Sequence, residues 1–291
     1  MNRLWSLAAT GAWIAGGALL LAQPEQISIP QPRKQFGAGL TGAFEGWFPS
    51  PADNTIRTFL VGYFNRNTQQ ELDIPIGPNN RIEPGGPDMG QPTHFLPGRK
   101  YGMFAIPVPK DFKEKYTWTL FANGQYNTIP LRLNPDYVTS PFSEIAVGNT
   151  PPVVRFEQDG APVQGPVAML AKTPSRATSV SQPLALTLWI TDDMKYTSGT
   201  GAPRNPDRPP VTLLWSKYRG PGAVKFDKAN PKAEGAASEA QGFNGKATTN
   251  VTFSEPGDYV LHVTVNDFSG DGGGGFQCCW TTGLVKVSVK P

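Results

Sequence analysis

The chain has 291 residues, of which 32 are Gly and 30 are Pro, so the composition excludes a helix bundle. Hydrophobic residues make up 38% of the chain and charged residues 17%, which excludes disorder and provides enough apolar mass for two domains. The formal net charge is only +3, and Lys and Arg are scattered, so we expect no nucleic-acid partner.

The N-terminus predicts export. Arg3 precedes an uncharged run, residues 4–22, which ends at Gln23-Pro24-Glu25. A positive start, an apolar stretch and a small residue before a polar break are typical of a signal peptide, here residues 1–22. The run is nearly as long as the roughly 20 residues that cross a bilayer, so an uncleaved membrane anchor is the alternative. Both interpretations place the rest of the chain outside the cytoplasm.

The first predicted domain, residues 36–142, follows a polar, Pro-containing linker, residues 23–35. Its strands are predicted from period-two alternation at residues 40–48, 56–64, 101–108 and 116–121. Asn123-Gly124 follows the last of these, and residues 125–133 are extended again. Because both turn residues tolerate positive φ, we predict a hairpin with a type I′ turn.

A long Pro- and Gly-rich loop is predicted at residues 65–100. Such segments are usually functional or disordered, and dense proline lowers the entropy of ordering, so we expect an ordered loop. Its candidate binding residues are Arg81, Asp88, His94 and Arg99. The alternative is a structural cover over an open sheet edge. A catalytic His94–Asp88 pair would lack an accompanying nucleophile.

Two aromatic residues of this domain are further candidates for binding. Trp47 lies on the strand face opposite Phe44 and Phe48, and Tyr63 lies opposite Phe64. One face of a sandwich sheet is solvated, so one interpretation is that some of these rings are exposed, and flat exposed rings can stack on glycans. The alternative is that these rings pack under the long loop or between domains.

The second predicted domain, residues 153–291, follows a linker, residues 143–152, which contains Pro151-Pro152. Its strands are predicted at residues 184–190, 211–215, 251–253, 259–265 and 285–289. Residues 230–245 are polar and rich in Ala and Gly, which predicts an exposed loop. Several short strands separated by turn signals are typical of a β-sandwich.

Two motifs carry a family resemblance. Residues 215–226 (WSKYRGPGAVKF) and 252–267 (TFSEPGDYVLHVTVND) combine a Trp-bearing strand, a Gly-Pro-Gly turn and a Pro-Gly-x-Tyr turn. Residues 151–290 thereby resemble the PKD and related Ig-like modules of bacterial surface proteins. Residues 36–142, with ELDIPIGPNNRIEPGGPD at 71–88, resemble uncharacterised exported bacterial proteins. The resemblance implies an Ig-like β-sandwich for residues 151–290, in a family of adhesins, enzyme appendages and spacers. Together with the strand pattern of the first domain, we expect an all-β fold of two tandem Ig-like β-sandwich domains.

Acidic residues gather in two loops of the second domain. In an Ig-like topology, strand 211–215 pairs antiparallel with 259–266, so the loops at 192–210 and 267–277 share one end of the sandwich. The candidate calcium ligands in them are Asp192, Asp193, Asp267 and Asp271. The alternative is that these residues end strands and form Asx turns.

The two cysteines, Cys278 and Cys279, are adjacent. Neighbouring trans residues lie about 3.8 Å apart, closer than the roughly 4.4–6.8 Å that disulfides prefer. An oxidising compartment nevertheless disfavours two free thiols. A vicinal disulfide, reduced thiols, a soft-metal site and an intermolecular bridge all stay open.

The sequence points away from catalysis. It holds two histidines, and neither G-x-S-x-G nor H-E-x-x-H occurs, so we expect no enzyme activity and no cofactor besides calcium. We expect an exported, non-catalytic binding or adhesion protein that recognises a glycan or an extracytoplasmic protein through its long loops. The alternative is a membrane-anchored structural or accessory subunit of a cell-envelope or membrane complex.

Overall fold

The computed structural model describes residues 34–144, 148–166, 173–195, 209–238, 240–267 and 278–291, which belong to one unit, Arg33–Pro291. The predicted all-β fold is confirmed: the one helical element in these ranges is a 3-10 turn, η1 (Pro135–Tyr137). They hold no helix with the length and apolar character that a membrane span requires. The predicted signal or anchor, residues 4–22, lies outside the described residues.

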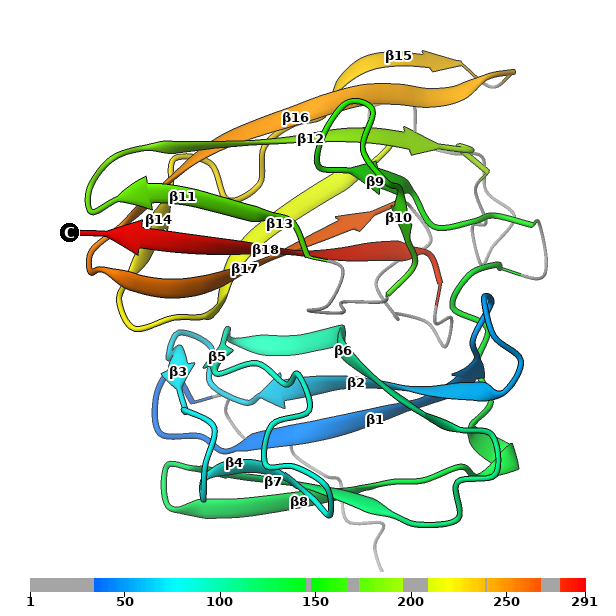
Figure 1. Ribbon diagram of the computed structural model, residues 1–291, viewed down its shortest axis with the longest axis vertical. Coiled ribbons are helices and arrows are strands. Elements are labelled where there is room, and N and C mark those ends of the chain that lie inside the picture. Colours follow the sequence, from blue (N-terminus) through cyan, green and yellow to red (C-terminus); the bar gives the residue numbers. More distant parts are fainter. Residues whose placement is uncertain (1–33, 145–147, 167–172, 196–208, 239, 268–277) are drawn as a thin grey trace, which may run out of the picture. The chain divides into compact units, whose positions relative to one another are not determined.

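The N-terminal lobe, residues 34–144, contains two three-stranded antiparallel sheets and a small two-stranded one (Figure 1). One has the strand order β1 (Leu40–Pro49), β2 (Ile56–Asn65) and β6 (Gly98–Pro109). The other, called the outer sheet here, has the order β4 (Asn80–Glu83), β7 (Tyr116–Ala122) and β8 (Gln125–Leu131). All the strands predicted in this lobe are confirmed.

The core of the N-terminal lobe lies between these sheets, because alternate residues of each strand point inward. Phe104 and Trp118 meet edge to face with their ring centroids 5.1 Å apart, and both are fully buried. The predicted hairpin joins β7 and β8, and its turn residues have positive φ, 48° at Asn123 and 77° at Gly124. These values are typical of a type I′ turn, so the prediction is confirmed.

The prediction of one continuous loop at residues 65–100 is wrong. Three short strands interrupt it: β4, and the pair formed by β3 (Leu72–Asp73) with β5 (His94–Phe95). β4 exists because it extends the outer sheet, where Ile82 pairs with Trp118. A four-residue strand with one alternation is set by its neighbour in the sheet rather than by its own pattern.

The C-terminal lobe, residues 148–291, contains two larger sheets. One has the order β10 (Val163–Gln164), β9 (Val153–Arg155), β12 (Leu184–Asp192), β16 (Gly242–Phe253) and β14 (Val224–Phe226), with β15 (Glu234–Ser238) beside β16. The other has the order β11 (Ser175–Ser179), β18 (Trp280–Lys290), β17 (Gly257–Asn266) and β13 (Thr212–Arg219). The predicted pairing of 211–215 with 259–266 is confirmed, since Leu213 opposes Val265.

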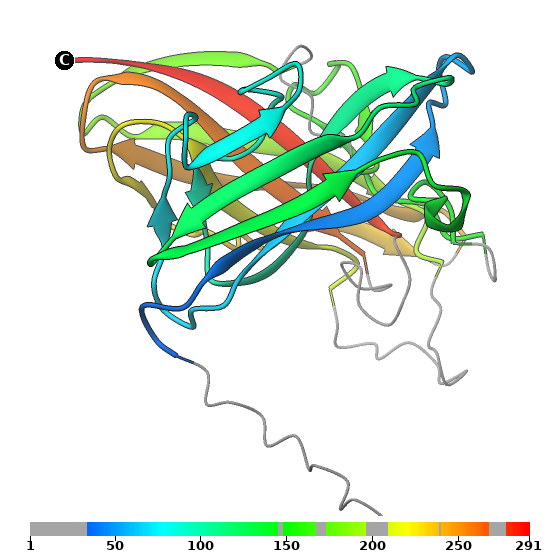
Figure 2. The same ribbon diagram turned by 90° about the horizontal axis from the view of Figure 1, so that it is seen from below.

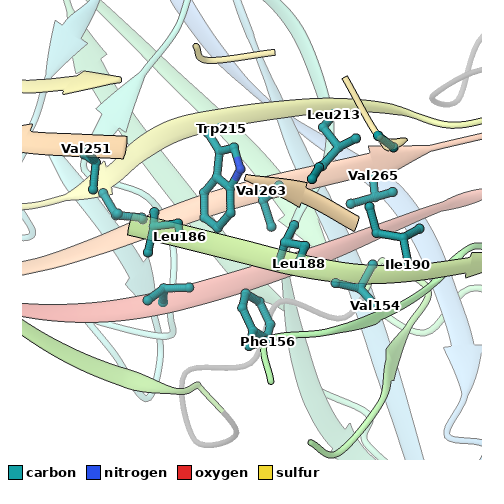
Figure 3. Packing of buried hydrophobic residues seen from close by; sticks show 14 of the residues in the cluster. Val154, Phe156, Leu186, Leu188, Ile190, Leu213, Trp215, Val251, Val263 and Val265 are labelled. Carbon is teal, nitrogen blue, oxygen red and sulfur yellow. The ribbon is translucent and has the colours of Figure 1, made fainter. Parts of the chain in front are cut away.

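The core of the C-terminal lobe is filled by the inward residues of both sheets. Figure 3 shows Trp215 packed among aliphatic side chains from several strands, including Leu186 and Val263. The prediction of a loop at residues 230–245 is wrong, because this segment contains β15 and the start of β16. All five residues of β15 are exposed, so backbone pairing rather than a buried side chain forms this strand.

The two lobes contact each other through the outward face of β13, β17 and β18. Tyr218 and Leu284 come from the C-terminal lobe, yet both belong to the buried apolar cluster of the N-terminal lobe. Trp280 packs with Phe48 and Leu60 in a second shared cluster. The two lobes are therefore joined by buried apolar contacts as well as by the polypeptide chain.

Candidate functional site

An open depression lies on the solvent side of the outer sheet. It has a volume of about 640 Å³ and is lined by Gly77, Pro78, Arg81, Glu83, Gly86, Pro87 and Tyr126. We call it the outer depression. Figure 2 views the molecule from the side of this sheet, so that β7 and β8 lie in front.

An aromatic pair stands at the edge of the outer depression. Phe121 and Tyr126 are cross-strand partners beside the β7–β8 turn, and their ring centroids are 4.3 Å apart. Trp118 and Leu120 are buried, so alternation along β7 directs Phe121 outward. The Tyr126 side chain is 65% exposed, among the most exposed large hydrophobic residues in the described ranges. Its ring therefore offers an open flat surface.

Arg81 supplies the polar part of the depression. Its Nε donates to Glu83 Oε2 at 2.8 Å, and Nη1 donates to the carbonyl oxygen of Pro78. Ile82 N donates to Pro87 O at 3.1 Å and closes the loop beside the pair. A guanidinium and a carboxylate held side by side present both donors and acceptors to a ligand.

Asp88 lies in the same segment but belongs to the contact between the lobes. Arg219 Nη1 and Nη2 donate to its two carboxylate oxygens at 2.9 and 2.8 Å, and Arg219 Nε donates to Gln91 O at 3.0 Å. The hydrogen bonds from Arg219 hold the pKa of Asp88 below its usual value, against the effect of burial. Tyr218 Oη also donates to the carbonyl oxygen of Gly90.

His94 is buried in the same contact. Its Nδ1 lies 3.0 Å from Asp73 Oδ1, and its Nε2 lies 3.3 Å from Glu71 Oε2. Lys217 Nζ is 2.8 Å from the same Asp73 oxygen. Burial alone would raise the pKa of Asp73, but the hydrogen bonds from His94 and Lys217 outweigh it and lower the pKa to about 2. His94 thus pairs with Asp73 rather than with Asp88.

The other three aromatic and cationic candidates are largely internal. Arg99 Nη2 donates to the buried Glu45 Oε1 at 2.7 Å, and its guanidinium lies 4.1 Å from the Tyr101 ring centre. Trp47 is half-buried and its Nε1 donates to Asn134 O at 2.7 Å. Tyr63 is 1% exposed, so the interpretation as an exposed ring is wrong for this residue.

Tyr63 is covered because two neighbours on the Pro- and Gly-rich segment close over it. Its ring packs edge to face on Phe95, with centroids 5.0 Å apart, and its hydroxyl oxygen accepts from Leu96 N at 2.9 Å. Of the alternatives weighed for this ring, packing under the long segment is the one that the structure shows.

The acidic candidates bind protein groups. Asp192 Oδ2 accepts from Met194 N at 2.9 Å, and Asp193 Oδ2 accepts from Thr150 Oγ1 at 2.9 Å. Asp267 Oδ2 accepts from Asn149 Nδ2 at 2.8 Å. Within the described ranges, no three His, Cys, Asp or Glu side chains are grouped to hold a metal. Asp271, the fourth predicted calcium ligand, lies outside these ranges.

The two cysteines form a vicinal disulfide, one of the alternatives left open above. The peptide bond between them is cis, and their Cα atoms are 3.0 Å apart, whereas the expected 3.8 Å assumed a trans bond. Both residues are buried, and Cys279 lies against the carbonyl oxygen of Asn149 at 3.5 Å.

Sequence reasoning missed Phe121 and Tyr126. The signal was present, because the predicted Asn123-Gly124 turn makes these two residues direct cross-strand partners. Alternation from Trp118 then places Phe121 on the solvent side. Arg81 is the one sequence candidate that lines the outer depression.

Comparisons with known proteins give no family. No protein-family model matches the chain, and no curated protein matches it. Six chains of solved structures match, among them the crystal structure of a protein of unknown function from Porphyromonas gingivalis W83. That protein is 9% identical, with a TM-score of 0.22, over 87% of this chain and 99% of its own.

Proposed function

We propose that this is an exported, non-catalytic protein that binds a glycan at the outer depression. The observation that carries the proposal is the Phe121–Tyr126 pair, in which Tyr126 is exposed, beside the Arg81–Glu83 pair. We also propose that the two lobes are tandem Ig-like sandwiches. The Trp-bearing β13 and the Pro-Gly-x-Tyr motif at the start of β17 support that assignment for the second lobe.

The chemistry of the depression fits a sugar ring. An aromatic side chain with an apolar face and a polar tip packs on the C–H face of a pyranose while its hydroxyl stays in water. Arg81 and Glu83 lie in the same depression and can donate to and accept from sugar hydroxyls. The rigid hairpin and the closed loop hold both parts in place, which lowers the entropic cost of binding.

The disulfide supports an extracytoplasmic location. Disulfides persist in oxidising compartments and are rare in the cytosol, and the Cys278–Cys279 bond is formed here. N-terminal sequencing of protein isolated from its source tests export. A mature start at Gln23 supports a cleaved signal, whereas a start at Met1 favours the anchored alternative.

A glycan array, followed by affinity measurement on the best ligand, tests the proposed site. Tyr126→Ala should weaken binding about fivefold or more, since one stacked ring contributes about 1 kcal/mol beyond its buried area. Tyr137→Ala is the matched control, because Tyr137 is also exposed, at 52%, but does not line the depression. Equal affinities for the two variants, or no glycan bound by the unmodified protein, would overturn the proposal.

A further inference from the structure

A second cavity lies where the two lobes meet, which we call the interlobe cleft. It has a volume of about 480 Å³, within the range of roughly 300–1,000 Å³ that is common for ligand sites. Its described lining residues come from β6, β13 and β17 and from the segments 209–211 and 230–232. None of these residues lines the outer depression, so the two sites are independent.

The floor of the interlobe cleft is the outward face of β13 and β17. Thr212 opposes Asn266, and Leu214 opposes Thr264, in one antiparallel ladder. Their neighbours Leu213 and Val265 belong to the core, so alternation brings these four side chains to the same face. The floor therefore mixes one apolar side chain with three polar ones.

The walls come from both lobes. Lys100, Tyr101 and Met103 lie on β6 of the N-terminal lobe, and the Tyr101 ring is backed by the Arg99 guanidinium. The opposite wall, residues 230–232, is held beside β13 because Trp215 N donates to Ala229 O at 2.8 Å.

A buried carboxylate fixes the bend of β6 at this wall. Glu45 lies at a bulge of β1, and its Oε2 accepts from Gly102 N at 2.8 Å. β6 has its own irregularity against β2 at the same level, between the partners of Val61 and Tyr63. Bulges turn a strand locally and re-aim its side chains, so this pair of irregularities sets the direction of Tyr101.

The charge of the cleft favours an anion. Two of the described residues that line it, Lys100 and Lys232, are lysines, and none of the described lining residues is Asp or Glu. A cleft lined by one sign of charge with low-dielectric walls concentrates its field and attracts the opposite charge.

The floor also holds a polar atom that calls for a donor. Asn266 Oδ1 is buried and has no hydrogen-bond partner among the residues that the structure describes. Buried side-chain oxygens are normally hydrogen-bonded, and each exception requires an explanation. A ligand hydroxyl in the cleft would supply the donor.

We propose that the interlobe cleft binds a small hydroxylated carboxylate, of which a uronic acid is the sugar form. Its carboxylate would lie by Lys100 and Lys232, a hydroxyl would donate to Asn266 Oδ1, and its C–H face would pack on Tyr101. Each part of this ligand would contact a separate feature of the cleft. The carboxylate matches the lysine charge, the hydroxyl matches the buried acceptor, and the C–H face matches the flat ring. A neutral sugar lacks the first feature, and a simple carboxylate lacks the other two.

Calorimetric titration of the full chain with D-glucuronate tests the proposal, with D-glucose and acetate as matched probes. We expect saturable binding of glucuronate, weaker by at least tenfold for both probes. Lys232→Met should weaken glucuronate binding about tenfold, as expected for one charge-assisted contact. Lys228→Met is the control, because Lys228 is exposed nearby on the same segment but does not line the cleft.

Asn266→Leu tests the buried acceptor separately, with thermal melting to confirm that the variant folds. It should weaken glucuronate binding and leave acetate binding unchanged. No saturable binding at about 10 mM glucuronate, a limit well above a millimolar Kd, would overturn the proposal. Equal binding of glucuronate and acetate, or unchanged binding in Lys232→Met, would also overturn it. Tyr137→Ala should leave this binding unchanged, because Tyr137 is exposed and lines neither site.

Discussion

The molecule contains two aromatic pairs, each beside an arginine–carboxylate pair. One is buried by neighbouring residues and the other is open to solvent, and this difference separates a structural contact from a surface available for binding. Tyr218 stacks on His262 at 5.8 Å, next to Arg219 and Asp88, and both rings are buried. Phe121 packs on Tyr126 at 4.3 Å, on the sheet where Arg81 holds Glu83, and Tyr126 is open to solvent. The side-chain chemistry is similar, so the difference lies in what covers each pair.

The Pro- and Gly-rich segment makes that difference. Its second half reaches the C-terminal lobe, where Thr93 N donates to Tyr218 O at 3.1 Å and Gly90 O accepts from the Tyr218 hydroxyl. Its first half ends at the loop closed by Ile82 and Pro87 and leaves Tyr126 open. One segment therefore builds the covered, structural pair and borders the open pair that we propose for binding.

The largest test of this comparison is truncation of each tyrosine. Tyr218→Ala should lower the free energy of unfolding by about 3–5 kcal/mol, the range for truncating a buried aromatic side chain. Tyr126→Ala should change it by less than about 0.5 kcal/mol, as for other surface substitutions. Chemical denaturation of both variants measures this. A loss of similar size in the two would break the distinction between covered and open pairs.

The second test uses two buried groups near the contact between the lobes. Their pKa shifts have opposite effects on how the free energy of unfolding changes with pH. Burial, opposed by Arg99 and by Gly102 N, raises the pKa of Glu45 to about 7. Burial and the Lys100 charge lower the pKa of His262 to about 3. In the unfolded chain Glu45 would titrate near 4.5 and His262 near 6.5.

The signs follow from the protons bound in each state. Between pH 4.5 and 7 the folded chain holds the Glu45 proton and the unfolded chain does not, so this group destabilises the fold as pH rises. Between pH 3 and 6.5 the unfolded chain binds a proton at His262 and the folded chain does not, so this group stabilises the fold as pH rises. The two contributions to the pH dependence of the free energy of unfolding therefore cancel between pH 5 and 6.5.

Single variants should uncover each slope. One proton corresponds to about 1.4 kcal/mol per pH unit, or about 2 kcal/mol between pH 6.5 and 5. Relative to the unmodified protein, Glu45→Gln should lose about that much stability as pH falls, and His262→Gln should gain it. Denaturation midpoints measured at both pH values check this. Parallel pH profiles for all three proteins would show that neither buried group is titrated as proposed.

Part of the fold could be predicted because several of its longer strands alternate, as β12 does between buried and partly buried residues. Leu213 and Trp215 on β13 and their partners on β17 were assigned both to strands and to a pairing, and the structure confirms both. The Asn123-Gly124 turn fixed a hairpin on its own, since few residues adopt two successive positive φ values. Where the local sequence pattern was strong, the strands and pairings of the structure agree with those predicted from it.

The short strands and the covered residues could not be predicted in this way. β3, β4 and β5 are two to four residues long, and their pairing depends on segments far along the chain. Tyr63 alternates correctly but is covered by Phe95 and Leu96, a contact that no period along β2 encodes. Alternation gives the face on which a residue lies, whereas burial of that face is decided by what packs over it.

The smallest test compares the two ion pairs. Asp88→Asn removes one charge from a bidentate pair in which Arg219 is only 17% exposed, so it should cost about 1 kcal/mol. Glu83→Gln removes one charge from an exposed pair and should cost less than about 0.5 kcal/mol.

The partly buried pair should also keep more of its effect on stability in about 1 M salt, where exposed charges are screened within about 3 Å. Unfolding midpoints of both variants at low and high salt measure this. If Glu83→Gln lowers the free energy of unfolding as much as Asp88→Asn does, the Arg81–Glu83 pair stabilises the fold. The pair at the outer depression would then not differ from the covered pair in the way proposed here.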